Sequence, residues 1–278
     1  MKRIYLVGLF TAVLFIAFNA SAWAQDPPIT VSFSDPSRPG LLKVNLLQGN
    51  ITVKTHAGKD VIIQTKARSN SVRRTNRRQD ADTAGLKRLD AVSSGVTVEE
   101  ENNVMSIGSS RMSNSTDLEI QVPVKTNLKL GILNGDYMVV QGVDGDIDAT
   151  NQNGDLTLAD VSGSVVAHSS NGKVVVTMKR VTPQKPMSFT SLNGNVDVTL
   201  PADTKANMKL RTDNGEVYTD FEVQIKPSTA APVVEDTRRS GGRFRINVDK
   251  SVLGAINGGG PDFELRTMNG NVYIRKLK

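Results

Sequence analysis

Hydrophobic and polar residues alternate in short segments over most of the chain. In residues 155–158, 173–177, 195–200 and 271–274, Val, Leu or Ile alternate with polar side chains. Such alternation is typical of strands that bury one face. The same pattern is found in residues 40–66, 96–98, 104–107, 118–122, 244–248 and 261–274. The chain is therefore predicted to be all-β.

Asn-Gly and related pairs separate these segments. The glycines Gly145, Gly154, Gly163 and Gly172 are nine residues apart. Asn and Gly readily adopt positive φ, so each pair marks a tight turn, either in a hairpin or at the corner of a coil. Short strands in repeats of ~18–22 residues favour a stacked, single-stranded β-helix or solenoid. Hairpin pairing would produce a β-sandwich, and the spacing alone leaves that alternative open. The pairs that mark these turns begin at Asn134, Asp144, Asn153, Ser162, Asn171, Asn193, Asn214 and Asn269.

The N-terminus has the layout of a secretory signal peptide. Lys2 and Arg3 precede an apolar run over residues 4–18, and Ala22-Trp23-Ala24 predicts cleavage before Gln25. The run is shorter than the ~20 residues that span a bilayer, which argues against a membrane anchor. Cleavage would lower the formal charge from +6 to +4 and leave a mildly basic protein that is periplasmic, surface-displayed or released.

Three regions are predicted along the chain. Residues 1–24 form the signal peptide, residues 25–125 an N-terminal β region, and residues 126–278 the Asn-Gly repeat region, with the last two forming one continuous β domain. A basic insertion at 68–91 interrupts the N-terminal region and is expected to be exposed, with one helical piece near 82–89. Residues 226–243, which contain prolines and glycines, are predicted to form a surface loop.

The residue inventory excludes several kinds of chemistry. The chain has no cysteine, which rules out disulfides, thiolate metal sites, a thiol nucleophile and a lipidated cysteine. Its two histidines are His56, expected in a turn, and His168, expected to be a strand side chain; neither has the sequence context of a hydrolase. Phosphate-loop and dinucleotide motifs are absent. We therefore predict no catalytic residue, no cofactor and no metal site.

Aspartates in the repeats offer two weaker possibilities. Residues 144–155 resemble a calcium loop in their acidic spacing, but Ala149 stands where that loop requires glycine. Alternation should also turn Asp146 and Asp148 outward on either side of Ile147. Paired carboxylates can cleave glycosides, but no aromatic platform is expected nearby. An enzyme that acts on polysaccharide would need two members of this set to face each other: Asp146, Asp148, Asp155 and Asp160.

The basic insertion is the candidate polyanion-binding site. Paired guanidinium groups bind phosphate or carboxylate in a bidentate manner. Because residues 68–91 contain no aromatic side chain, such binding would be electrostatic and sensitive to salt. The alternative is a solvated loop whose arginines face Asp80, Asp82 and Asp90. The candidate residues are Arg73, Arg74, Arg77 and Arg78.

Several segments resemble a known family. They are Ile120-Gln121-Val122-Pro123, Asn134-Gly135-Asp136, Asn153-Gly154-Asp155-Leu156, residues 256–260 and Met268-Asn269-Gly270-Asn271-Val272. Together they resemble the putative-adhesin β-repeat family of bacterial exported proteins, a domain of unknown function, over roughly residues 40–278. The resemblance implies a coil-like β-repeat domain outside the cytoplasmic membrane with an adhesive role, and it supplies no functional residues.

Three functions are compatible with these features. The first is a non-enzymatic exported β-repeat protein that binds an envelope polymer or protein, without specific nucleic-acid binding and without a transmembrane segment after cleavage. The second is a periplasmic scaffold or regulatory partner of an envelope sensor. The third is an enzyme acting on polysaccharide. Open strand edges at the ends of a β-coil would also permit self-association.

Overall fold

A computed structural model describes residues 27–67, 96–109, 115–226, 233–236, 244–247 and 251–278. These residues form β-strands joined by turns, and the all-β prediction is confirmed. The described part contains no helix that could cross a membrane. The predicted signal peptide, the basic insertion with its four arginines and the helical piece near 82–89 all lie outside the described residues.

Two large sheets contain almost all of the strands. In spatial order, sheet A consists of β1 (Ile29–Ser32), β4 (Asp60–Ala67), β7 (Thr116–Pro123), β3 (Ile51–His56), β9 (Tyr137–Gln141), β11 (Asp155–Gly163), β13 (Val174–Val181), β15 (Val196–Leu200), β23 (Val272–Lys276) and β17 (Val217–Thr219). Sheet B consists of β18 (Val223–Lys226), β21 (Val252–Ile256), β16 (Ala206–Asn214), β22 (Asp262–Asn269), β14 (Met187–Asn193), β12 (Val165–Asn171), β10 (Ile147–Asn153), β8 (Thr126–Asn134), β2 (Gly40–Gln48), β6 (Val104–Ser109) and β5 (Val96–Glu101).

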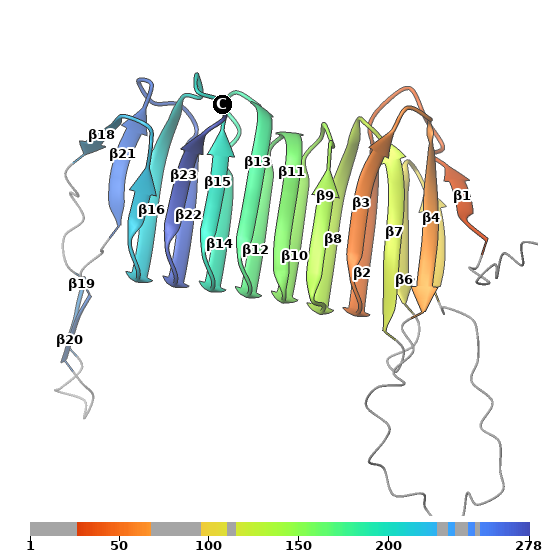
Figure 1. The fold of residues 1–278 in the computed structure, drawn as a ribbon, viewed down its shortest axis with the longest axis horizontal. Helices are drawn as coiled ribbons and strands as arrows, with labels where there is room; N and C mark the ends of the chain where they lie inside the picture. Colours follow the sequence, from red (N-terminus) through yellow and green to blue (C-terminus); the bar gives the residue numbers. More distant parts are fainter. Residues whose placement is uncertain (1–26, 68–95, 110–114, 227–232, 237–243, 248–250) are drawn as a thin grey trace, which may run out of the picture.

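The repeating unit is one coil, made of a strand from sheet B, an Asn-Gly corner and a strand from sheet A. Corresponding strands of neighbouring coils are parallel, as in β10 with β12 and β11 with β13. Parallel neighbours cannot be joined by two-residue hairpins, so the repeat region is a stack of coils, as the turn spacing favoured. Figure 1 shows the coils side by side along the long axis, with β1 at one end and β18 at the other.

The order of the coils departs from the order of the chain. The C-terminal coil, β22–β23, lies between β14–β15 and β16–β17. Antiparallel strands extend both ends of the stack: β4 pairs with β7, β5 with β6, and β21 with β16. The segment predicted as a loop contains β19 (Val233–Asp236), which pairs antiparallel with β20 (Phe244–Asn247), a strand that alternation had predicted. The loop prediction overlooked the β-branched pair Val233-Val234.

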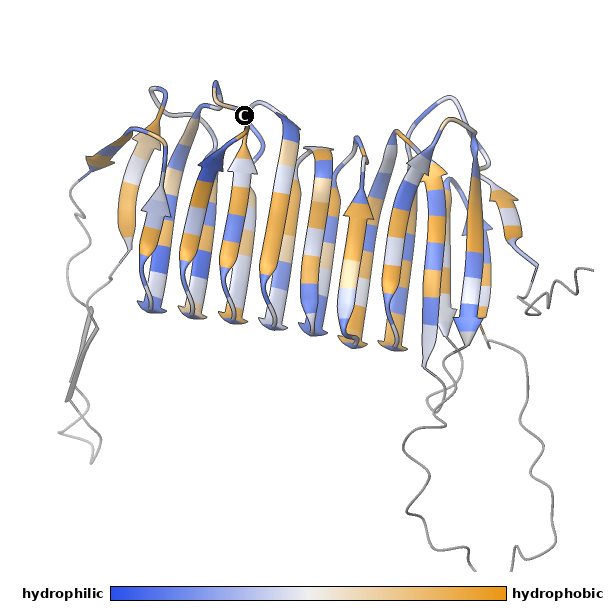
Figure 2. Cartoon of the chain, viewed as in Figure 1, coloured by the Kyte–Doolittle hydropathy of each residue, from blue (hydrophilic) through white to orange (hydrophobic). Residues whose placement is uncertain are grey.

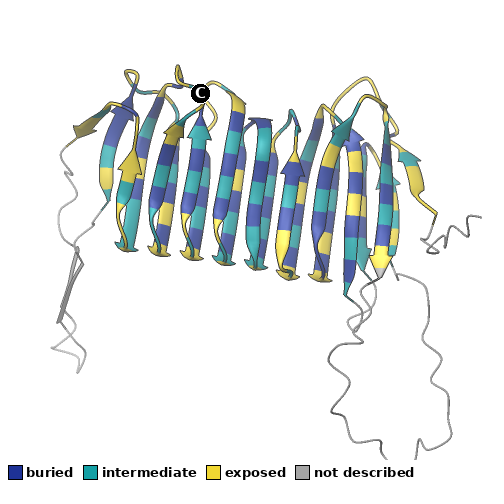
Figure 3. Cartoon of the chain, viewed as in Figure 1, coloured by how far each residue is buried: buried dark blue, intermediate teal, exposed yellow. Residues whose placement is uncertain are grey.

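The core lies between the two sheets. Alternate residues of each strand point inward, so hydropathy and burial both change with a period of two (Figures 2 and 3). In register across the stack, Leu156, Val174, Val196 and Val272 are all fully buried. Each coil therefore covers the apolar row of the next. Burial of these rows stabilises a chain that has no cysteine and hence no disulfides.

Side-chain ladders hold the Asn-Gly corners together. Asn153, Asn171 and Asn193 are linked in sequence, each donating from Nδ2 to Oδ1 of the preceding asparagine at 2.8–2.9 Å. Asn269 and Asn214 continue this ladder. At the following glycine, no side chain fits: a Cβ on Gly154, whose φ is +146°, would lie 2.0 Å from the Gly135 carbonyl oxygen. The corner sequence is thus dictated by close stacking of backbones.

Candidate functional site

The arginines selected from sequence lie outside the described residues, so their role stays a prediction. The described histidines occupy structural positions. His168 lies on the outer face of β12, where Nδ1 is 2.8 Å from Thr190 Oγ1. The neighbouring Ser170 hydroxyl donates to Gln152 Oε1 at 2.7 Å. His56 closes a turn, with Nε2 2.7 Å from the Asp60 carbonyl oxygen and Nδ1 accepting from the Gly58 amide.

The repeat aspartates do not gather in one place. Asp148 faces outward on sheet B and pairs with Lys129 at 3.2 Å, whereas Asp155 belongs to sheet A and pairs with Lys173 at 3.5 Å. Asp146 contacts Lys185 at 2.7 Å, and Asp160, with φ +56°, sits at an irregularity in β11. Ile147 is buried between Asp146 and Asp148, as alternation predicted. Among the described residues, no group of three or more metal-ligating side chains is found.

A groove of about 580 Å³ lies on the outer face of sheet B near the end that carries β18. It crosses β12, β14, β22, β16 and β21, and it is hollow because Ser188 is small compared with its neighbours in the same row, Val166 and Glu264. The apolar side chains that it exposes are Val166, Pro186 and Leu253; Met187, Met208 and Phe263 also line it, but their side chains are buried in the core. Its volume lies within the ~300–1,000 Å³ typical of ligand sites.

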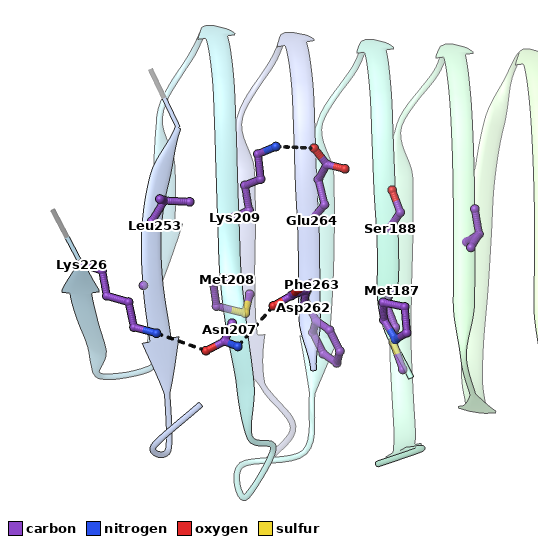
Figure 4. A pocket seen from close by; sticks show the side chains of 13 residues that line it. Met187, Ser188, Asn207, Met208, Lys209, Lys226, Leu253, Asp262, Phe263 and Glu264 are labelled. Atoms are coloured by element: carbon purple, nitrogen blue, oxygen red, sulfur yellow. Dashed lines mark hydrogen bonds and ion pairs between the residues drawn. The ribbon is translucent and has the colours of Figure 1, made fainter. Parts of the chain in front are cut away.

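Polar groups lie around the groove in two rows (Figure 4). In one row, Lys209 Nζ lies 3.5 Å from Glu264 Oε1. In the other, Asn207 donates from Nδ2 to Asp262 Oδ1 at 3.2 Å, and its Oδ1 accepts from Lys226 Nζ at 3.4 Å. Donors and acceptors therefore alternate across the sheet, in which neighbouring strands are ~4.8 Å apart.

The part of the frame on β16 and β22 is rigid because each of these strands is paired on both sides, whereas Lys226 stands on β18, the last strand of sheet B. Met208 and Phe263, directly below the polar rows, are at most 2% exposed. Asn207 is fixed further by donation to the Gly260 carbonyl oxygen at 2.7 Å. In contrast, Lys209 and Glu264 are about half exposed, and such ion pairs contribute little to stability. A ligand could therefore replace this pair at small cost.

A second cluster lies on the outer face of sheet A at the same end. The rings of Tyr218 and Tyr273 stack with centroids 5.3 Å apart, and the Arg275 guanidinium lies 5.0 Å from the centre of the Tyr273 ring. Arg275 also binds Asp197 through Nε at 2.9 Å. The hydrogen bond to Glu216 raises the pKa of the Tyr218 phenol. This aromatic pair lies on the opposite face from the groove and was not predicted.

Both clusters depend on the insertion of the C-terminal coil. Ser188 and Glu264 are neighbours only because β22 pairs with β14, and Tyr218 meets Tyr273 only because β17 pairs with β23. No local motif marks these residues. The one available signal was the repeated Asn-Gly corner at Asn214 and Asn269, which predicts that the flanking strands are equivalent in the stack.

No protein-family model and no curated protein sequence matches the chain. Among the solved structures that match the chain, three are described as putative adhesins or a putative cell adhesion protein, all at low identity. A putative cell adhesion protein from Clostridium sporogenes is 11% identical, with TM-score 0.44 over 90% of this chain and 99% of its own. Putative adhesins from Bacteroides fragilis and Parabacteroides merdae are 11% and 7% identical, with TM-scores of 0.27 and 0.30; each match covers 91% of this chain and 98% or 96% of the other.

Proposed function

We propose that the chain is a non-enzymatic, exported β-repeat protein that adheres to an envelope polymer through the groove on sheet B. The observation that carries the proposal is the groove itself: a shallow apolar floor with two lysines, two carboxylates and an amide, all on one rigid outer face. The predicted signal peptide supports the proposal, because an exported protein would meet such polymers outside the cytoplasm.

The chemistry of the groove suits a hydroxyl-rich polymer such as a polysaccharide. Lys209 and Lys226 can donate to ligand hydroxyls, whereas Asp262 and Glu264 can accept from them. The exposed Val166 side chain gives the less polar face of a sugar ring a surface to cover. Since the two lysines balance the two carboxylates, binding at the groove should depend on hydrogen bonding and contact area more than on net charge.

Binding without turnover is part of the proposal. At His168, Nδ1 is 2.8 Å from Thr190 Oγ1, while Nε2 lies 3.4 Å from the Ser170 hydroxyl, which makes a shorter hydrogen bond of 2.7 Å to Gln152 Oε1. Of the aspartates considered for glycoside cleavage, Asp148 on sheet B pairs with Lys129, and Asp155 on sheet A pairs with Lys173. Neither arrangement supplies the activated pair that hydrolysis requires.

The test is cosedimentation of the purified chain with isolated cell-wall sacculi and with extracted envelope polysaccharide. Ser188→Trp fills the groove without removing any described hydrogen bond, so we expect the dissociation constant to rise at least about tenfold. Thr157→Trp puts the same ring on the outer face of sheet A and should bind like the wild type. A Ser188→Trp variant that binds normally would contradict the assigned site. Release of soluble sugar ends during incubation would contradict binding without turnover.

A further inference from the structure

The two ends of the stack have complementary steps. At one end, sheet A stops at β17, while sheet B continues for two more strands, β21 and β18. At the other end, sheet A extends three strands beyond β3, through β7 and β4 to β1, while sheet B extends only two beyond β2, through β6 to β5. Sheet B therefore overhangs one end and sheet A overhangs the other.

Apolar side chains cover the inner faces of these overhangs. Ile225 and Val252 are in register with inward-facing positions of sheet B, yet they are 73% and 37% exposed. At the opposite end, Ile29 is in register with the buried Ile63 but is 39% exposed. Of the six half-buried hydrophobic residues that pack against the core, five lie at these two ends: Val31, Val96, Val98, Val217 and Val223.

We propose that the chain binds a second copy of itself head to tail through these steps. Strand β1 of one copy pairs with the outer edge of β17 in the next, where no described strand is paired in the single chain. Ile29 and Val31 then cover Ile225 and Val252. Between the last coil of one copy and the first coil of the next, sheet A has three strands and sheet B has four, so the two sheets stay nearly in step.

Charge favours this partner over a two-fold contact. On the outer face of β5, the exposed side chains include Glu99 and Glu101, whereas on the outer face of β18 they include Lys226. Head-to-tail joining brings β5 beside β18 and places these opposite charges on the same face. Pairing β5 with β5 would instead bring like charges together. Charged side chains on edge strands commonly prevent such pairing.

The contact joins two different surfaces of the chain, so each copy keeps one free end after binding. Such a heterologous contact, propagated without closure, extends into a linear array. The outer faces of sheet B would then be aligned along one side of the array. Several grooves in one array would bind a polymer with a higher overall affinity than a single groove, because linked sites act at a high effective concentration. Formation of the array does not depend on the function proposed for the groove.

The test uses sedimentation velocity of the purified chain over a range of concentrations, with Ile29→Lys and Ile225→Lys as single variants. The wild type should form oligomers that grow with concentration. Each variant alone should stay monomeric, with its association constant lowered at least about tenfold. An equal mixture should form dimers and no larger species, because each variant retains the end that the other has lost. Leu133→Lys, which changes an exposed leucine on the outer face of sheet B, should associate like the wild type.

Three results would overturn the proposal. The first is a wild-type chain that stays monomeric throughout the concentration range. The second is self-association of Ile29→Lys alone, which would indicate a two-fold contact between β18 edges. The third is a mixture of variants that forms no dimers although each variant has the wild-type urea unfolding midpoint. That midpoint should be unchanged, because both substituted side chains are exposed in the single chain.

Discussion

Substitution of Thr267 by valine measures how strongly buried hydroxyl groups fix the coils. Thr267 is fully buried, and its Oγ1 donates to the Gly194 carbonyl oxygen of the neighbouring coil at 2.7 Å. The same kind of bond joins Ser169 to Gly154 and Ser191 to Gly172. Each hydroxyl thus satisfies a carbonyl that the Asn-Gly corner turns toward the interior.

Valine has nearly the shape of threonine but no hydroxyl, so the main loss is one hydrogen bond to a buried carbonyl. An unsatisfied group of this kind costs about 1–3 kcal/mol, and we expect the free energy of unfolding to fall by that amount. Thr267→Ser keeps the hydroxyl and removes a methyl group, which should cost about 1 kcal/mol. Thr212→Val removes the equivalent bond to Gly270 at a half-exposed position, where water can replace it, and should cost less than about 1 kcal/mol.

Urea unfolding of the three variants supplies the measurement, provided that the slope of free energy against urea is unchanged. The expected order of destabilisation is Thr267→Val above Thr212→Val. The reasoning would be refuted by a Thr267→Val variant as stable as the wild type, or by equal losses at the buried and half-exposed positions.

Other predictions concern the corners, the pH dependence and the insertion. Gly154→Ala forces a side chain into a glycine-only conformation against a carbonyl and should cost at least about 1–3 kcal/mol in urea unfolding, whereas Gly108→Ala, with open space around it, should cost far less. Hydrogen bonds from Ser34 lower the pKa of the Glu100 carboxyl. The stabilisation that this carboxylate contributes is therefore complete above its usual pKa of 4.5 and is lost as pH falls through the folded pKa. Glu100→Gln should reduce the change of the urea midpoint with pH in that acidic range, and an unchanged pH profile would contradict this assignment. In a quadruple variant, Arg73, Arg74, Arg77 and Arg78 are changed to alanine. If the insertion binds polyanions, this variant should lose the salt-sensitive part of envelope binding, measured at low and high salt. A variant whose binding depends on salt as strongly as that of the wild type would refute this role.

Local features of the fold could be predicted because they depend on neighbouring residues. Alternation identified the strands that became β11, β13, β15 and β23, and positive-φ propensity identified their corners. The nine-residue spacing also favoured coils over hairpins, since it leaves each strand too short to pair alone. Even the outward directions of Asp146 and Asp148 followed from the buried Ile147 between them.

The arrangement of the coils could not be predicted, because equivalent corners can stack in many orders. Nothing near Asn269 indicates that it bonds to Asn193, which is 76 residues away, instead of being the last member of the ladder. The groove and the tyrosine pair both result from that order. The sequence drew attention to the arginines because they are adjacent in the chain, whereas Lys209 and Glu264 become neighbours only through strand pairing.

The most direct test of adhesion through the groove is a lysine-acetylation footprint of the chain bound to isolated cell-wall sacculi, read by mass spectrometry. Lys129 is a matched reference, because it pairs with Asp148 on the same face of sheet B and is exposed to a similar extent as Lys209. Binding in the groove should slow acetylation of Lys209 and Lys226 and leave Lys129 unchanged. Equal protection of Lys129 and Lys209, or protection confined to Lys87 in the insertion, would contradict the proposed site.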